Sequence, residues 1–312
     1  MIQPTALVAV LTATLCWSGN FVIGREIHGL INPFALAFWR HVVASVLLLP
    51  FIIRPLWHCR RAVIKEWPTL VGMAASGIVL FNVGTYAALQ TIPAVRSVMI
   101  LAFAPMAILV FSRFLAHERL TRNQIVGVVV SFVGVAFLEI EDTAASLGSI
   151  FGMGIGDVWM AAAVIGFALN TVLVRRLPKE IPTIVAYGIA VMLGVVGLIP
   201  EYMTTFGEAP TIVRIDLWSA IVFLALGPSI AAYFCWFYAI RVAGPQRVGN
   251  CILLVPLFGA VLGVLLLSER FTGALAAGGA MIFAGVALSL IDPGSRPQPS
   301  LAADKGASAV VT

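Results

Sequence analysis

The stretch Leu115–Thr121, LAHERLT, places a charged Glu-Arg pair between two long runs of apolar residues. Almost the same letters, LLSERFT, return at Leu266–Thr272, 151 positions further along. A comparison without gaps at this offset, of residues 96–136 with residues 247–287, gives 12 identical pairs in 41 positions. The regions before these segments match more weakly at nearly the same offset. The chain is therefore a duplicated unit, and each charged stretch marks the same turn in its own copy.

The composition excludes an ordinary soluble domain. Of the 312 residues, 61% are hydrophobic and 11% are charged, whereas a soluble domain carries about 25% charged residues. A helix needs about 20 apolar residues to cross a bilayer. Lipid offers no hydrogen bonds to backbone N–H and C=O groups, so these groups must bond one another within a helix. The sequence predicts an all-α polytopic membrane protein with ten transmembrane helices, at 5–23, 33–53, 69–89, 95–114, 121–138, 158–176, 183–203, 216–240, 246–267 and 272–290.

Each copy would cross the membrane five times, so the second copy must be inverted relative to the first. The basic residues independently favour this arrangement, because the even-numbered loops hold twelve and the odd-numbered loops hold four. The positive-inside rule places the even loops and both termini in the cytoplasm. The twelve are Arg54, Arg60, Arg61, Lys65, Arg113, Arg119, Arg122, Arg175, Arg176, Lys179, Arg241 and Arg247, and the four are Arg25, Arg96, Arg214 and Arg270.

The expected organisation has three parts. Residues 5–140 form the first five-helix repeat, residues 156–291 form the second, and residues 292–312 are a disordered cytoplasmic tail. Thr121 and Thr272 directly follow the charged pairs, and each should cap the helix that starts there. Inverted repeats are typical of secondary transporters, which exchange two conformations around a central site. The alternative is that duplication only built a stable bundle.

Several motifs strengthen the transporter interpretation. WSGNFV lies at 17–22, NPFALAFWR at 32–40 and GD at 156–157, and a P…ER…G…GVA pattern occurs in both copies. In this order and spacing they resemble the EamA family of the drug/metabolite transporter superfamily. The resemblance covers residues 5–291. It implies ten helices, two EamA repeats, and export of metabolites such as amino acids across the inner membrane of a bacterium.

The repeat also predicts interrupted helices. Pro105 and Pro256 occupy equivalent positions in the fourth and ninth passes, where proline frees the carbonyls of Leu101 and Ile252. Such a kink either lines a transport site or only shapes packing. The fifth and tenth passes carry small residues at helical spacing, which favours close packing or a dimer face. The small residues in question are Gly127, Ser131, Gly134, Ala276, Ala280 and Ala284.

Polar side chains inside the passes are expected to face a central cavity, because lipid does not accommodate them. The polar candidates for substrate binding are Ser18, Asn20, Asn82, Tyr86, Asn170, Tyr233 and Asn250. Aromatic walls would come from Trp17, Phe21, Phe103, Phe167, Trp236 and Phe237. This set suits a small neutral or zwitterionic solute with an apolar part, although packing is the simpler role for each ring.

Arg40 is the clearly intramembrane charge, and it has two interpretations. It either attracts a substrate carboxylate or locks helices together, with Glu26 as one possible partner. The second copy has no matching arginine, since Ile189 or Ala190 stands there, and this favours the structural role. Arg96 and Arg247, at the starts of the fourth and ninth passes, are expected to extend to the membrane interfaces.

Other classes of function are less well supported. The four histidines are scattered, no nucleophile motif or phosphate-binding loop occurs, and the cysteines have no paired spacing; these observations disfavour an enzyme, a metal site or a cofactor. Nucleotide sugars or phosphate esters would need clustered Lys or Arg in the cavity. The expected partners are the lipid bilayer and a small-molecule substrate, with no nucleic acid, for a monomer or homodimer.

The inverted topology can be tested by labelling single cysteines introduced as Glu118→Cys and Glu269→Cys in a variant without the four native cysteines. A membrane-impermeant maleimide should label the Glu269→Cys protein on intact cells. It should label the Glu118→Cys protein only after permeabilisation. Labelling of both turns from the same side would contradict the topology.

Overall fold

The computed structural model describes residues 3–26, 30–92, 94–115, 120–138, 154–204, 215–266 and 272–291, and within these ranges every regular element is a helix. The charged Glu-Arg pairs at 118–119 and 269–270 and the tail from residue 292 lie outside them. The helices are α1 (Pro4–Glu26), α2 (Pro33–Lys65), α3 (Trp67–Met73), α4 (Phe81–Leu89), α5 (Ala94–Leu101), α6 (Ala104–Leu115), α7 (Arg122–Leu138), α9 (Ile155–Arg176), α10 (Thr183–Thr204), α11 (Ile215–Leu224), α12 (Ala232–Ala243), α13 (Pro245–Gly249), α14 (Leu254–Leu266) and α15 (Gly273–Leu290).

These elements form ten passes, which agree with the ten apolar runs of the sequence. Eight of the described helical segments are long and apolar enough to cross a bilayer, and α1 and the shorter apolar helix α7 supply the other two. Two passes are continuous only through a π-helical segment, η1 (Ala74–Leu80) between α3 and α4 and η3 (Ala225–Ala231) between α11 and α12. The prediction of an all-α polytopic fold is confirmed.

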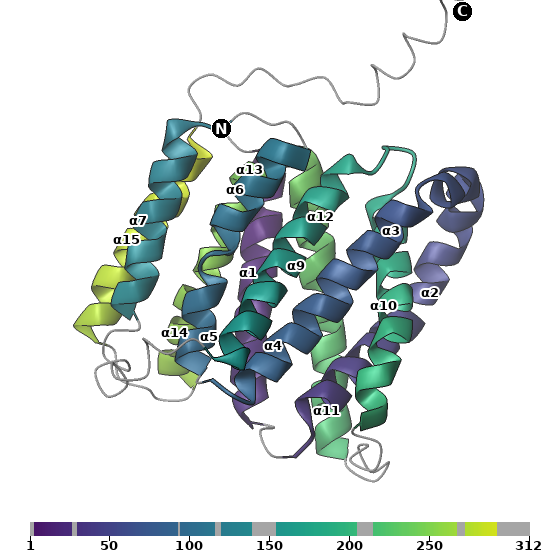
Figure 1. Ribbon diagram of the computed structural model, residues 1–312, viewed down its shortest axis with the longest axis horizontal. Coiled ribbons are helices and arrows are strands. Elements are labelled where there is room, and N and C mark those ends of the chain that lie inside the picture. The colour runs from purple at the N-terminus through teal and green to yellow at the C-terminus, as the bar shows by residue number, and fades with distance from the viewer. Residues whose placement is uncertain are drawn as a thin grey trace, which may run out of the picture.

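The packing of α7 against α15 shows the inversion directly. The two helices lie side by side at one edge of the molecule (Figure 1). A β-carbon at Gly127 would meet the carbonyl of Gly285, and one at Gly134 would meet the carbonyl of Gly278, so the helices run antiparallel. The offset of 151 converts Gly127 into Gly278 and Gly134 into Gly285, which exchanges the two contacts. Two copies related by a two-fold axis in the plane of the membrane give this pattern.

The small residues that make this contact differ on α15 from those expected. Gly127, Ser131 and Gly134 do face α15, and the hydroxyl of Ser131 donates to the carbonyl of Ile282 at 3.3 Å. On α15, however, Ala276, Ala280 and Ala284 are exposed. The glycine stripe of α15 is used instead, because a residue without a β-carbon allows the backbones to approach more closely.

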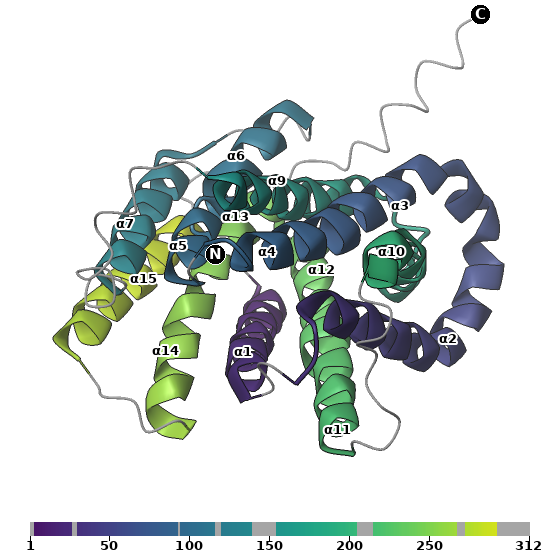
Figure 2. The same ribbon diagram turned by 60° about the horizontal axis from the view of Figure 1, so that its bottom comes forward.

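The remaining passes interlock in equivalent pairs. Helix α1 packs on α12 and α14 of the other copy, and its equivalent α9 packs on α4 and α6. Helices α2 and α10 pack on each other, at the opposite side from α7 and α15 (Figure 2). Neither copy therefore buries its own apolar faces without the other.

The starts of α7 and α15 are capped as predicted. The Thr121 and Thr272 hydroxyls accept hydrogen bonds from the amides of Gln124 and Leu275.

The interrupted passes occupy equivalent positions in the two copies. The offset of 151 moves residues 74–80 onto 225–231, which are the bounds of η1 and η3. Helix α5 ends at Leu101, four residues before Pro105, and a 3-10 segment (Asn250–Leu253) precedes Pro256. The helix breaks predicted at both prolines are present, and they lie in the turn before each ring, where proline cannot complete the hydrogen-bond ladder.

We expect the substitution Gly285→Ala to destabilise the protein, because its β-carbon would lie 2.5 Å from the Gly127 carbonyl oxygen and 2.6 Å from the Ser131 amide nitrogen. Both groups are backbone and cannot move aside, so the cost should be about 1–3 kcal/mol. Thermal unfolding of the purified protein in detergent measures the effect. Gly273→Ala, on the same helix with nothing within 4 Å, is the matched control. Equal melting temperatures for both variants would contradict this packing.

Candidate substrate site

A cluster of aromatic rings fills the centre of the bundle, where α1, α9 and α12 meet. The Trp17 ring lies 5.9 Å from Phe167, 5.3 Å from Tyr233 and 5.2 Å from Trp236, measured between centroids. Phe167, Tyr233 and Trp236 are each 3% exposed or less. The sequence predicted all four rings as walls or ligands of the site, and the structure brings them together.

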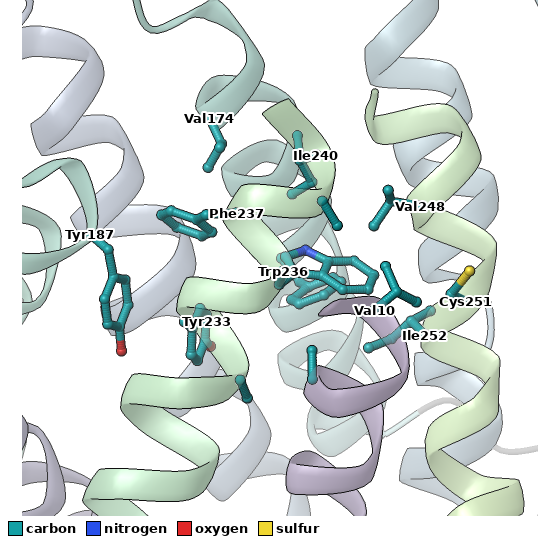
Figure 3. Packing of buried hydrophobic residues seen from close by; sticks show 14 of the residues in the cluster. Val10, Val174, Tyr187, Tyr233, Trp236, Phe237, Ile240, Val248, Cys251 and Ile252 are labelled. Carbon is teal, nitrogen blue, oxygen red and sulfur yellow. The ribbon is translucent and has the colours of Figure 1, made fainter. Parts of the chain in front are cut away.

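The cluster extends to α10, where Tyr187 joins it. Tyr187 was not among the residues predicted from the sequence. Figure 3 shows Tyr233, Trp236 and Phe237 projecting from one helix, with Tyr187 facing Tyr233 and Phe237. The rings of Tyr187 and Tyr233 stack with centroids 5.4 Å apart. Tyr187 is the single hydroxyl-bearing ring in an otherwise apolar stretch, TIVAYGIAVMLG, and this signal was available in the sequence. We call Trp17, Phe167, Tyr187, Tyr233, Trp236 and Phe237 the aromatic cluster.

The cluster is tied to the two π-helical segments by hydrogen bonds. The indole nitrogen of Trp17 donates to the carbonyl of Pro228 in η3 at 3.1 Å, and Tyr187 donates to the neighbouring carbonyl of Ser229. The Tyr233 hydroxyl lies 3.5 Å from the carbonyl of Gly77 in η1. Gly77 and Pro228 are equivalent at the offset of 151. The irregular turns thus expose the same carbonyl in each copy, and an aromatic side chain satisfies each one.

Arg40 lies next to the aromatic cluster and bridges two other helices. Its Nη1 donates to the side-chain oxygen of Asn20 on α1 at 3.1 Å, and its Nη2 donates to that of Asn82 on α4 at 2.6 Å. Asn82 in turn donates to the carbonyl of Ile78 in η1 at 2.7 Å. Arg40 is 7% exposed, and its Nε is buried without a partner. The side chain of Glu26 lies outside the described residues.

Asn170 is the equivalent of Asn20 in the second copy, and it lies against the irregular turn of η1. A β-carbon at Gly77 would lie 2.4 Å from the side chain of Asn170, so only glycine leaves room for this amide. Its nitrogen is buried without a hydrogen-bond partner, as is the hydroxyl of Ser229 in η3. Asn170 is on the same helix as Phe167, and the carbonyl of Ser229 accepts from Tyr187, so both unsatisfied groups belong to residues joined to the aromatic cluster.

Comparison with known proteins identifies the architecture. Residues 4–140 and 154–291 each match the EamA-like transporter family. The chain belongs to this family. An uncharacterized transporter of Archaeoglobus fulgidus is 29% identical over 297 residues, covering 93% of this chain and 98% of that protein. The uncharacterized inner membrane transporter YhbE of Escherichia coli is 24% identical over 271 residues, covering 81% and 78%.

A solved crystal structure shares the fold of this EamA-like transporter. It superposes with a TM-score of 0.74 at 21% sequence identity, over 92% of this chain and 96% of that one. The protein is therefore a multi-pass membrane transporter of the drug/metabolite transporter superfamily, with the duplicated repeat that its sequence shows.

Three candidate residues of this transporter lie away from the aromatic cluster. Ser18 donates to the carbonyl of Val255, and so joins α1 to α14 just before Pro256. Asn250 joins passes five, nine and ten through Ser131, Gly285 and Ser289. Phe103 is 46% exposed and contacts Phe132. Tyr86 contacts Phe34, and its hydroxyl is near enough to Tyr233 to interact with it electrostatically. The side chain of Phe21 lies outside the described residues. Periodicity alone could not separate these helix faces.

The rings of the aromatic cluster are closely packed and shielded from solvent. The second-copy members of the aromatic cluster are buried from both ends of the bundle. A hollow of about 410 Å³ lies elsewhere, between the last turns of α2 and the α9–α10 connection, and is lined by His58, Arg61 and Glu180 among others. Among the described residues, no group of three His, Cys, Asp or Glu is placed to hold a metal ion. Rings, amides and one guanidinium are the groups that a cargo would meet.

An ion pair joins α5 to the first turn of α9. The Nε of Arg96 on α5 lies 2.5 Å from one carboxylate oxygen of Asp157 on α9, and its Nη2 lies 2.9 Å from the other. Asp157 also accepts from the amide of Gly154 and caps α9. Arg96 was expected to extend to the interface, and the structure gives its guanidinium a bidentate carboxylate partner in the first turn of α9, in a partly buried place.

We expect Arg96→Gln and Asp157→Asn to be coupled in a double-mutant cycle. The pair is about four-fifths buried or more on both sides, so a coupling free energy of about 1–2 kcal/mol should appear in unfolding measurements. Asparagine keeps an oxygen for the Gly154 amide, and the cycle therefore isolates the charge pair from the helix cap. Additive effects of the two substitutions would contradict a stabilising pair.

Proposed function

We propose that this EamA-like transporter is a secondary carrier that exports small neutral or zwitterionic metabolites, amino acids foremost, by alternating access. The observation that carries the proposal is the aromatic cluster with its unsatisfied amide and hydroxyl, at the junction of two inverted repeats. Rings accommodate an apolar side chain, and nearby donors fix the orientation of polar groups. We further propose an inner-membrane location with both termini in the cytoplasm, as a monomer or homodimer.

Alternating access follows from the exchangeable contacts of the two copies. Helices α1 and α9 sit at equivalent positions, and each packs on passes of the opposite copy. If the two copies exchange conformations, access switches from one face of the membrane to the other around the same central residues. The π-helical segments and the breaks before Pro105 and Pro256 give the four interrupted passes points at which to bend.

A phosphorylated cargo such as a nucleotide sugar is the rival within transport, and the charges disfavour it. A dianion needs several Lys or Arg in one place, and the described residues around the aromatic cluster supply Arg40 alone. A membrane enzyme is the rival from another class. Among the described residues of the lining, no nucleophile is paired with a base, and His41 bonds the carbonyl of Ala37 in its own helix.

Counterflow in proteoliposomes tests the proposal. The purified full-length protein is reconstituted with unlabelled amino acids inside, and entry of the same labelled amino acid is followed. We expect at least one apolar amino acid to exchange, and Phe167→Ala to reduce its rate by about tenfold or more, because a buried ring at the centre contributes several kcal/mol. Phe103→Ala, which removes an exposed ring of the same type, is the matched control.

A growth assay gives an independent outcome in a living host. Cells that express the transporter should tolerate toxic amounts of the amino acid identified by counterflow, whereas cells that express the Phe167→Ala variant should not. Exchange of phosphorylated sugars with no amino-acid exchange would replace this proposal by its rival.

A further inference from the structure

Arg40 carries a full charge into the bundle, and the described residues give it only neutral partners. Its two hydrogen bonds to described side chains end on the amide oxygens of Asn20 and Asn82. The carboxylate of Asp157, by contrast, is paired with Arg96. An arginine cannot lose its proton in a protein. Among the described side chains, only dipoles offset this charge.

A charge in this position is costly unless an opposite charge reaches it. The side chain is 7% exposed, and one of its nitrogens, Nε, has no acceptor at all. Two amide oxygens would hold α1, α2 and α4 together equally well if they bonded a neutral donor. A purely structural role thus explains the two bonds, but it explains neither the charge nor the unpartnered Nε.

The second copy lacks the charge of the first, which suits a cargo with one charged end and one apolar end. Where the first copy has Arg40, the second has Ile189 or Ala190, and α10 contributes Tyr187 to the aromatic cluster instead. The scaffold is therefore symmetric, but the first copy supplies a charge where the second supplies an apolar residue. Asn170 lies against Gly77 with an amide nitrogen that has no partner.

We propose that Arg40 is the specificity-determining group for a carboxylate of the cargo, which displaces the Asn82 oxygen and binds the guanidinium. This inference rests on the proposed function and narrows it to monocarboxylates such as amino acids. The apolar end of the cargo lies among Trp17, Phe167 and Trp236. Because Asn82 also bonds the backbone of η1, its release frees the π-helical turn of the third pass and couples binding to movement.

The test compares amino acids with their carboxamides, which differ only in the group that Arg40 would read. L-Phenylalanine, L-leucine and L-threonine and the amide of each are titrated against the full-length protein in detergent, with thermal stabilisation as the measure of binding. The wild type should bind at least one acid about tenfold or more tighter than its amide, since a charge-assisted pair is lost. Arg40→Gln should remove this preference, because it should weaken binding of the acid and leave binding of the amide unchanged.

Two further variants separate recognition from folding. Arg96→Gln removes an arginine of the same chain that already has a carboxylate partner, and it should keep the preference for the acid. Arg40→Lys keeps the charge and should retain a reduced preference, which remains measurable if Arg40→Gln does not fold. Asn82→Ala should tighten binding of the acid, because the competing oxygen is gone.

The outcomes separate two hypotheses, the binding of a carboxylate by Arg40 and the transport of amino acids. An acid preference that is unchanged in Arg40→Gln, or a wild type that binds acid and amide equally, overturns the carboxylate assignment and leaves the transport of amino acids standing. Failure of every acid and amide to bind removes the proposed cargo, and the assignment with it.

Discussion

Lipid offers no hydrogen bonds to an open backbone, and this constraint governs where the chain can leave regular helix. Every irregular turn among the described passes must lie inside the bundle and find a partner from another pass. The Gly77 and Pro228 carbonyls meet this requirement through Tyr233 and Trp17. The same side chains that satisfy the backbone also form the aromatic cluster. Irregular backbone and candidate site therefore coincide because one condition produces both.

The inverted duplication decides which irregular turns exist. One bend in an ancestral five-helix unit appears twice, so η1 and η3 lie at equivalent positions, as do the breaks before Pro105 and Pro256. The antiparallel crossing of α7 and α15 holds the two copies in register through glycine pairs that exchange with each other. A rigid crossing at the edge and bendable passes at the centre are the parts that a carrier with two alternative conformations needs.

The sequence predicted the passes, the duplication and the breaks at both prolines, because each depends on composition or on local covalent geometry. It also predicted most rings of the aromatic cluster, since aromatic residues in apolar helices are few. It could not place Phe103 or Asn250, because helical periodicity says which residues share a face but not which neighbour that face meets. The π-helical segments left no pattern beyond SG and GPS, and the Arg96–Asp157 pair joins residues 61 apart. Tertiary contacts alone decide these features.

The difference between the two copies in the residues of the lining determines which substrate the shared scaffold can carry. A perfectly duplicated site would present the same groups to both ends of a cargo, and it would suit a solute with two similar ends. Here the first copy has Asn20 and a charge at Arg40, whereas the second has Asn170 and presents Tyr187. Both copies still supply the same bends and the same helix crossings. Since the scaffold tolerates change at the lining without losing those contacts, substrate range can diverge in the family while the fold persists.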